Sequence, residues 1–93
     1  MTVDAEGGCL CGRIRYLVRG APVAATLCHC GDCRRASGGT NVAWAVFNGQ
    51  DFEWLAGEPA DHESSPGIHW LFCATCGSTV GYRRSERPGH MDI

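Results

Sequence analysis

Lysine is absent from the sequence: all eight basic residues are arginine, and they face ten acidic residues, so the formal net charge is -2. A protein that binds nucleic acid by neutralising phosphates needs a strongly basic surface. The charge balance therefore argues against nucleic acid as a partner. The two arginine pairs, Arg34-Arg35 and Arg83-Arg84, are interpreted first as solvated surface residues, with a local anion site as the alternative.

Long apolar stretches are absent as well. No run approaches the roughly 18–20 residues that a membrane-spanning helix needs, so no membrane partner is expected. The first six residues are acidic and lack the apolar segment of a secretory signal. The predicted location is therefore the cytoplasm, where thiols stay reduced and cysteine pairs hold metal more often than they form disulfides.

Internal repeats, low-complexity segments and a sustained three–four periodicity are also missing. Short segments with period-two alternation, separated by glycine-containing turns, predict strands instead. The predicted strands span residues 12–19, 41–47, 52–55, 67–72 and 79–82. One short helix is predicted from Asp32 to about Ser37, ended by the following glycine pair. The polar segment 58–66 is predicted to be an exposed loop, and residues 1–93 to be one mainly β domain.

What the sequence does have is cysteine, seven in 93 residues. A domain of this size often needs disulfides, metal or oligomerisation for stability. An odd number of cysteines would leave one thiol unpaired in a closed disulfide framework. The cysteines lie in three clusters, Cys9-Leu10-Cys11, Cys28-His29-Cys30-Gly31-Asp32-Cys33 and Cys73-Ala74-Thr75-Cys76.

The spacing of these clusters predicts two metal sites. The last cluster has two residues between its cysteines and a glycine after them, which lets both sulfurs face one ion, and the first can supply two more ligands from a tight turn. Four thiolates make a closed structural zinc site. These four are Cys9, Cys11, Cys73 and Cys76. Three thiolates remain, which with an open position have the layout of a catalytic zinc. These three are Cys28, Cys30 and Cys33.

Several alternatives stay open at this point. The cysteines could form a redox pair, could be small buried hydrophobic residues, or could hold a single zinc ion with thiols to spare. The middle cluster could also act as a redox or metal sensor whose thiols oxidise together. His62, His69 or His90 could supply a fourth ligand, whereas His29 is expected to point away from the metal. All-thiolate ligation in such turns favours zinc over iron.

Taken together and in this order, the motifs closely resemble the glutathione-dependent formaldehyde-activating enzyme family, also called GFA or the CENP-V/GFA domain. The matching segments are 8–16, 28–38 and 72–78. The resemblance implies an Mss4-like fold of short antiparallel sheets and two zinc ions per chain. It implies that Cys9, Cys11, Cys73 and Cys76 hold the structural ion. It implies that Cys28, Cys30 and Cys33 hold the second, substrate-facing ion.

The resemblance also implies an activity. Family members add glutathione to formaldehyde, which gives S-hydroxymethylglutathione, and they are classed as carbon–sulfur lyases. A small thiol at the open metal position would lose its proton and attack the aldehyde, so Cys28, Cys30 and Cys33 would be the catalytic ligands. Arg34 and Arg35 would bind the carboxylates of glutathione. The alternative is a non-catalytic thiol carrier or protein-interaction module in which both ions are structural.

Family members usually continue past the equivalent of residues 87–89 with a further strand and a C-terminal segment. The chain is therefore expected to be truncated relative to the family at its C-terminus, or to close in a different way. An edge strand left unpaired there would favour a homodimer.

Overall fold

A computed structural model describes residues 4–93 of the chain. Within this range the backbone forms nine strands, one α-helix and one 3-10 turn. Their bounds are β1 (Asp4–Gly8), β2 (Arg15–Arg19), β3 (Ala24–Cys28), α1 (Gly31–Ser37), β4 (Val42–Asn48), η1 (Gly49–Asp51), β5 (Phe52–Ala56), β6 (Ala60–Ser65), β7 (Ile68–Phe72), β8 (Thr79–Arg84) and β9 (His90–Asp92). The prediction of a mainly β domain with one short helix is confirmed.

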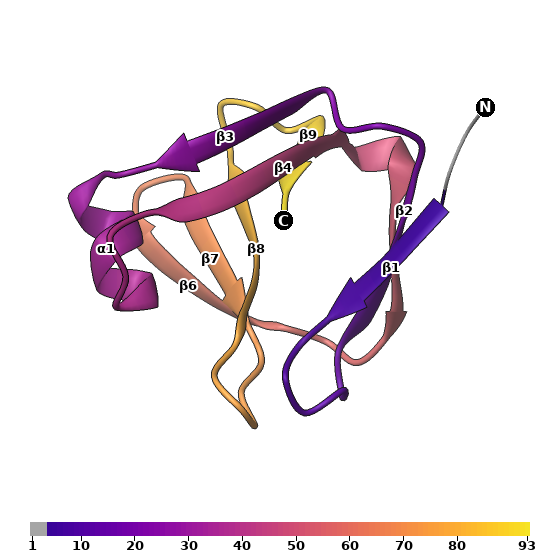
Figure 1. Ribbon diagram of the computed structural model, residues 1–93, viewed down its shortest axis with the longest axis horizontal. Coiled ribbons are helices and arrows are strands. Elements are labelled where there is room, and N and C mark those ends of the chain that lie inside the picture. Colours follow the sequence, from indigo (N-terminus) through magenta and orange to yellow (C-terminus); the bar gives the residue numbers. More distant parts are fainter. Residues whose placement is uncertain (1–3) are drawn as a thin grey trace.

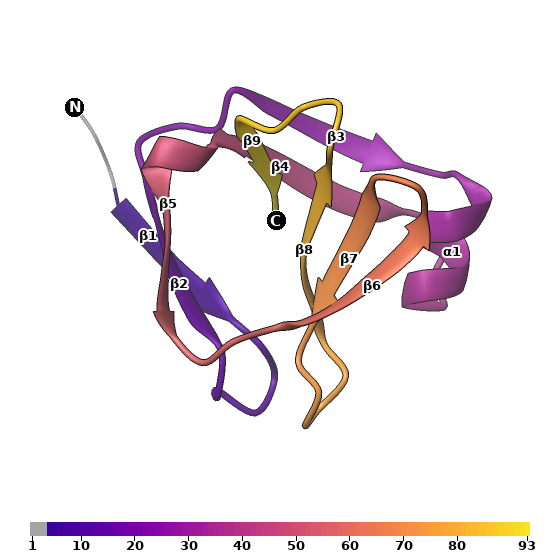
Figure 2. The ribbon, with the colours of Figure 1, turned by 180° about the vertical axis from the view of Figure 1, so that it is seen from behind.

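The strands form two antiparallel sheets. The smaller has the order β1-β2-β5, and the larger has the order β3-β4-β9-β8-β7-β6. Figure 1 shows the small sheet standing to one side of the curved large sheet, with α1 at the opposite end of the molecule. The view from behind shows the same arrangement, with β9 between β4 and β8 (Figure 2). No described helix is long and apolar enough to cross a membrane.

The single helix is bounded as its sequence predicts. It begins after Cys30, whose sulfur accepts a hydrogen bond from the backbone N–H of Cys33 at 3.3 Å, as an N-cap side chain does. It ends at Gly38, which has a φ of 72° in the left-handed region that favours glycine. The N–H of Gly38 donates to the carbonyl of Arg34 at 2.9 Å and so closes the last turn.

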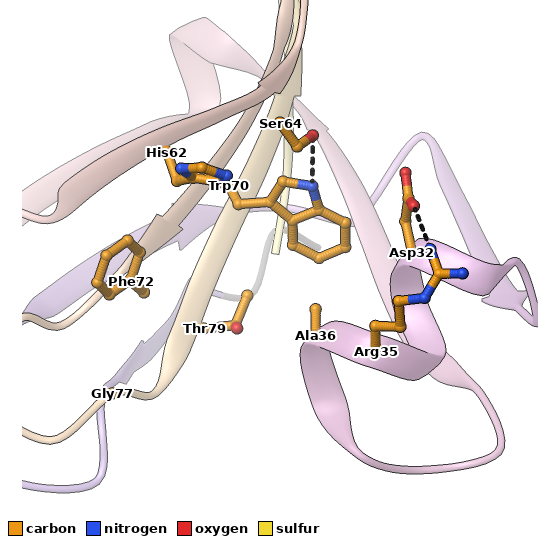
Figure 3. Close-up of a pocket in the computed structure, with 9 residues that line it drawn as sticks. All are labelled: Asp32, Arg35, Ala36, His62, Ser64, Trp70, Phe72, Gly77 and Thr79. Atoms are coloured by element: carbon orange, nitrogen blue, oxygen red, sulfur yellow. Dashed lines mark hydrogen bonds and ion pairs between the residues drawn. The ribbon is translucent and has the colours of Figure 1, made fainter.

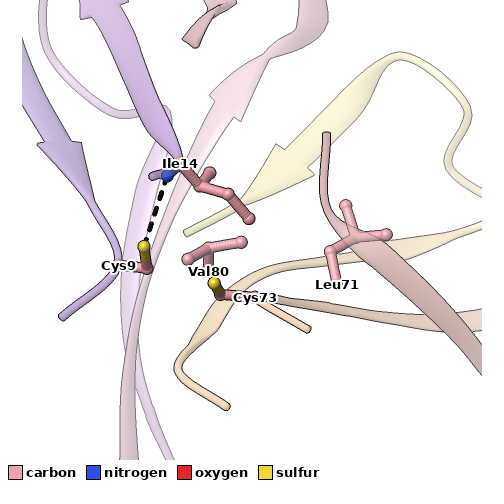
Figure 4. Close-up of a cluster of buried hydrophobic side chains, with 5 residues drawn as sticks. All are labelled: Cys9, Ile14, Leu71, Cys73 and Val80. Carbon is pink, nitrogen blue, oxygen red and sulfur yellow. Dashed lines mark hydrogen bonds between the residues drawn. The ribbon is translucent and has the colours of Figure 1, made fainter. Parts of the chain in front are cut away.

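Two small clusters of buried side chains hold the elements together. The first joins the sheets and comprises Cys9, Ile14, Leu71, Cys73 and Val80 (Figure 4). The second lies under α1 and comprises Cys33, Trp44 and Trp70, with Tyr82 packed against it. Each cluster contains at least one of the seven cysteines, so each cysteine group lies against one part of the hydrophobic core.

The structure departs from the sequence prediction at one loop and three strands. The predicted loop 58–66 is wrong for most of its length, because β6 occupies it and pairs with β7 along an exposed edge of the large sheet. Its side chains are polar on both faces, which removes the alternation that identifies a half-buried strand. The strands β1, β3 and β9 were not predicted, and β9 has only three residues.

Candidate metal centres and the cavity beside them

The first candidate centre is a group of four cysteines whose sulfur atoms all lie within 4.8 Å of one another. They are Cys9, Cys11, Cys73 and Cys76. The sulfur of Cys11 lies 3.6 Å from that of Cys9 and 3.7 Å from that of Cys73. A tetrahedral ion with Zn–S bonds of about 2.3 Å would place its ligands about 3.8 Å apart. These two distances match a zinc tetrahedron, and the other sulfur pairs lie within 4.8 Å.

Two turns from different parts of the chain build this group. The β1–β2 turn carries Cys9 and Cys11, and the β7–β8 turn carries Cys73 and Cys76. The N–H of Ile14 donates to the sulfur of Cys9 at 3.3 Å (Figure 4). Gly12 and Gly77 follow the two cysteine pairs with φ values of 82° and 80°, a conformation that other residues rarely adopt. The glycines thus let each turn present two sulfurs on the same side.

Ser78 connects the two turns and stabilises one thiolate. Its hydroxyl accepts the N–H of Leu10 at 3.0 Å and lies 3.3 Å from the sulfur of Cys76. Hydrogen bonds from the Ser78 hydroxyl and N–H, and from the N–H of Cys11, lower the pKa of the Cys76 thiol to about 5. At Cys11 a backbone bond at Arg13 lowers the pKa, but burial and the neighbouring sulfurs outweigh it and raise the pKa to about 11. Sulfurs this close cannot all ionise without a cation among them, so the donor set fits a divalent ion.

The second candidate centre is a group of three cysteines taken from six consecutive residues. Cys28 ends β3, Cys30 caps α1, and Cys33 lies buried in the first turn of the helix; their sulfurs also lie within 4.8 Å of one another. Within residues 4–93, no histidine or carboxylate belongs to this group. The described chain therefore offers three thiolates here and no fourth ligand, which is the layout of a metal site with an open position.

The thiols of this second group differ strongly. The backbone N–H of Cys33, and then the Cys33 side chain, lower the pKa of the Cys30 thiol. Burial, followed by the neighbouring sulfur of Cys28, raises the pKa of the Cys33 thiol to about 12. An exposed sulfur that ionises readily thus lies beside a buried one that resists ionisation. A bound cation would offset the burial and the neighbouring sulfur that keep this thiol protonated.

A cavity of about 500 Å³ extends from the three-cysteine group, and we call it the thiol cavity. Its volume falls within the range of about 300–1,000 Å³ that is usual for small-molecule sites. Aromatic side chains form part of its wall, namely Trp44, Trp70 and Tyr82. Burial raises the pKa of the Tyr82 hydroxyl, so this group is neutral near pH 7. The polar residues that line the cavity include Arg84, Arg87, His90 and Asp92, together with Thr26 and Asp32.

A second hollow, of about 560 Å³, lies between α1 and the strands β6, β7 and β8 (Figure 3). Asp32 and Trp70 line both hollows, so they form the border between them. The indole N–H of Trp70 donates to the Ser64 hydroxyl at 3.2 Å, which holds the ring in this position. Arg35 lies on the outer side of this hollow, 3.8 Å from the carboxylate of Asp32, and its side chain is 84% exposed.

The structure brings the seven cysteines into the same four and three that their spacing suggests, while their binding of metal stays a prediction. The two arginines predicted to bind carboxylates do not line the thiol cavity: Arg35 lines the second hollow and Arg34 lines neither. Of the histidines, His62 lines the second hollow and His90 the thiol cavity. His69 lies 2.7 Å from a carboxylate oxygen of Asp61 and away from both cysteine groups.

Sequence reasoning named His90 as a possible fourth metal ligand and the pair Arg83-Arg84 as a possible anion site, but it missed Arg87 and Asp92, which also line the thiol cavity. The basic pair Arg83-Arg84 was the available signal, because strand alternation places only one of the two on the face that carries Tyr82. Which face lines a cavity could not be known, because that depends on the pairing of β8 with the unpredicted β9.

Comparison with known proteins identifies the family. No curated protein matches the sequence. One similar solved structure is the crystal structure of a Rhodobacter sphaeroides protein, with 22% identity and a TM-score of 0.78 over 96% of this chain and 83% of that one. At this identity the likeness establishes the fold alone. The family model described as "Glutathione-dependent formaldehyde-activating enzyme" matches residues 4–93. The chain therefore belongs to the glutathione-dependent formaldehyde-activating enzyme family.

Proposed function

We propose that the chain is a zinc-dependent carbon–sulfur lyase that adds a glutathione-type thiol to formaldehyde or a related aldehyde. The observation that carries this proposal is the three-cysteine group at the wall of the thiol cavity, which lacks a fourth protein ligand in the described part of the chain. Family membership supports the choice of glutathione and formaldehyde as the reactants.

The proposed metal content is two zinc ions per chain with different tasks. The four-cysteine group would hold a structural ion, because its spacing matches a closed tetrahedron. The three-cysteine group, Cys28, Cys30 and Cys33, would hold the catalytic ion. A zinc ion held there would stabilise the thiolate form of a substrate thiol that occupies its open position.

The reaction forms one bond and moves one proton. The thiolate sulfur donates an electron pair to the aldehyde carbon, and the π electrons of the carbonyl move to its oxygen. That oxygen takes a proton, so the product carries a hydroxymethyl group on sulfur; the reverse reaction cleaves the carbon–sulfur bond. Neither direction needs an oxidant or a reductant.

The chain's own residues would orient the reactants and exclude water. Trp44 and Trp70 give the thiol cavity apolar walls, which strengthen electrostatic interactions inside it. The neutral hydroxyl of Tyr82 is the candidate hydrogen-bond donor to the aldehyde oxygen. Arg34 and Arg35 remain proposed contacts for a carboxylate outside the thiol cavity, since α1 carries both beside the three-cysteine group.

The decisive test measures S-hydroxymethylglutathione formation with purified, metal-loaded protein. The addition also proceeds without an enzyme, so the expected result is a rate above the uncatalysed one that increases in proportion to protein concentration. Cys30→Ala should abolish the increase, whereas His29→Ala, an exposed neighbour, should keep it. An uncatalysed rate combined with glutathione binding would favour a thiol carrier, and no binding at all would favour a protein-interaction module.

Two further features complete the proposal. The seven free cysteines suit a reducing compartment, and we place the protein in the cytoplasm. The assembly we propose is a homodimer through β3, an edge of the large sheet whose residues carry no charge; the other edge, β6, carries Asp61 and Glu63. Light scattering should give twice the chain mass, and Leu27→Lys on the exposed β3 should reduce it to a single chain.

A further inference from the structure

We propose that Arg84, Arg87 and His90 form an anion subsite that binds a carboxylate of the thiol substrate inside the thiol cavity. This inference rests on the proposed function and deepens it, because it says which kind of thiol the cavity selects. It moves part of the carboxylate recognition from the helix arginines to the end of the thiol cavity that Arg84, Arg87 and His90 line.

Strand register places the cysteines and the basic residues on one face of the large sheet. Cys28 pairs with Val42, and Val46 pairs with Asp92, while Asp92 also pairs with Tyr82. Paired residues of antiparallel strands point to the same face, as do residues two positions apart. Arg84, two residues after Tyr82, and His90, two residues before Asp92, therefore lie on the face that carries Cys28.

The same register gives the separation between the two ends of the cavity. Val42 and Val46 are four residues apart on β4, so Cys28 and Asp92 lie about 13 Å apart along the sheet. A bare thiol as small as mercaptoethanol cannot span that distance. A peptide-sized thiol that carries a carboxylate can place its sulfur at the cysteines and its anionic group near the arginines.

Three nitrogen atoms of the basic residues at this end have no hydrogen-bond partner in the described part of the chain. Within the described residues, Arg84 Nε, Arg87 Nε and His90 Nδ1 are buried and make no hydrogen bond. Buried polar atoms in proteins are nearly always hydrogen-bonded, so three in one cavity wall need an explanation. These three atoms are themselves closed off, whereas the side chains of Arg84 and Arg87 are 38% and 39% exposed and line the cavity, so their terminal nitrogens can bind a carboxylate through two parallel hydrogen bonds.

Local carboxylates only partly satisfy these donors. Arg87 lies 3.5 Å from Asp92, which is 7% exposed, and Arg84 Nε lies 3.0 Å from the exposed Glu86 but without hydrogen-bond geometry. Glu86 does not line the cavity. Among the described residues, Asp92 is thus the one carboxylate that lines this end of the cavity beside the two arginines, and the ion-pair partner of Arg84 lies outside the cavity. Burial raises the pKa of Asp92, so ionising this carboxyl inside the wall is itself costly.

The test compares glutathione with its diethyl ester, which keeps the thiol and lacks both carboxylates. Calorimetry on zinc-loaded protein should show the ester binding at least tenfold more weakly than glutathione, since a charge-assisted hydrogen bond contributes enough for about a tenfold difference in affinity. Arg84→Gln should weaken glutathione binding about tenfold and leave the ester unchanged. Arg83→Gln is the matched control, because it removes the same charge from the opposite face of β8, where Arg83 pairs with Asp61 at 3.0 Å.

Asp92→Asn keeps the test informative if an arginine variant folds poorly. Removing the one carboxylate from this end of the cavity should tighten glutathione binding, and damage to the fold cannot produce a gain. Equal affinity for glutathione and its ester, or equal effects of the Arg83 and Arg84 substitutions, would overturn the subsite while leaving the lyase proposal intact. Absence of binding by both thiols to the zinc-loaded wild type would overturn the lyase proposal and this inference with it.

Discussion

The two cysteine groups differ in how far apart their residues lie in the sequence and in what surrounds their sulfurs. The first joins turns that are 62 residues apart, between Cys11 and Cys73, and two of its four cysteines lie in the core, where Cys9 is 7% exposed and Cys73 2%. The second comes from six consecutive residues, Cys28 to Cys33, and faces a cavity. An ion in the first group would close a long loop and connect both sheets, whereas an ion in the second would restrain only one turn. Sequence separation and burial thus distinguish a site that holds the fold from a site that is free to bind a substrate.

The largest expected effect comes from Cys76→Ala in the first group. Structural zinc sites in small domains contribute about 10–16 kcal/mol of binding energy, which is comparable with the whole stability of a domain, about 5–15 kcal/mol. We therefore expect loss of one metal ion and of the folded circular dichroism spectrum. Thr75→Ala, in the same exposed turn, should keep both. A Cys76→Ala protein that melts like the wild type would remove the distinction between the two groups.

A chelator should remove the ion of the second group before the ion of the first. Each group has one exposed cysteine, but the second group has an open position through which a chelator can reach its ion, while the first is closed by four sulfurs. With EDTA we expect one ion per chain to leave early with little change in circular dichroism. The second ion should leave later, together with the folded structure. Simultaneous release of both ions would show that the groups are equally accessible.

Cys30→Ala should affect the second group alone. It removes one of three thiolates and the N-cap bond to the N–H of Cys33, whose loss costs about 1 kcal/mol. We expect elemental analysis to fall from two ions per chain to one, catalysis to fall to the uncatalysed rate, and the melting temperature to fall by a few degrees. Two ions still bound to this variant would contradict the division into four and three.

The same contrast explains how much could be predicted from the sequence. The helix and its end at Gly38 were predictable because capping and turn residues act within a few positions. The grouping of the cysteines followed from ligand spacing and from the four ligands of a closed site. The segment forming β6 was misjudged because pairing with β7, and not its own pattern, makes it a strand.

Sequence reasoning could name His90 and the pair Arg83-Arg84, but it could not place them at the thiol cavity, for a related reason. His90 and Asp92 belong to β9, a three-residue strand inserted between β4 and β8. Nothing in three residues marks such a position, because the strand order depends on contacts between distant segments. Arg84 could be recognised as one of a basic pair, but the sequence could not show which residues of the neighbouring strand lie beside it. Local rules therefore found the metal ligands, and only the tertiary structure placed the residues that would select the substrate.

The smallest expected effect, and the finest test of the comparison, comes from two serines. Ser78→Ala removes the hydroxyl that contributes most to lowering the pKa of Cys76 to about 5, so that pKa should rise toward the ordinary 9.0. The pKa of Cys76 is lower in the folded protein than its ordinary value of 9.0, so ionisation of this thiol stabilises the folded state. The contribution is fully present above pH 9.0 and is lost as the pH falls through about 5. Protons would compete with the metal at higher pH in the variant, so acid release of the structural ion should shift upward by a few tenths of a pH unit.

Ser37→Ala is the matched change near the second group, where the hydroxyl donates to the carbonyl of Cys33 and not to a sulfur. It should leave the release of either ion unshifted, and an equal shift in both variants would mean that serine removal acts through general stability instead of through the thiolate.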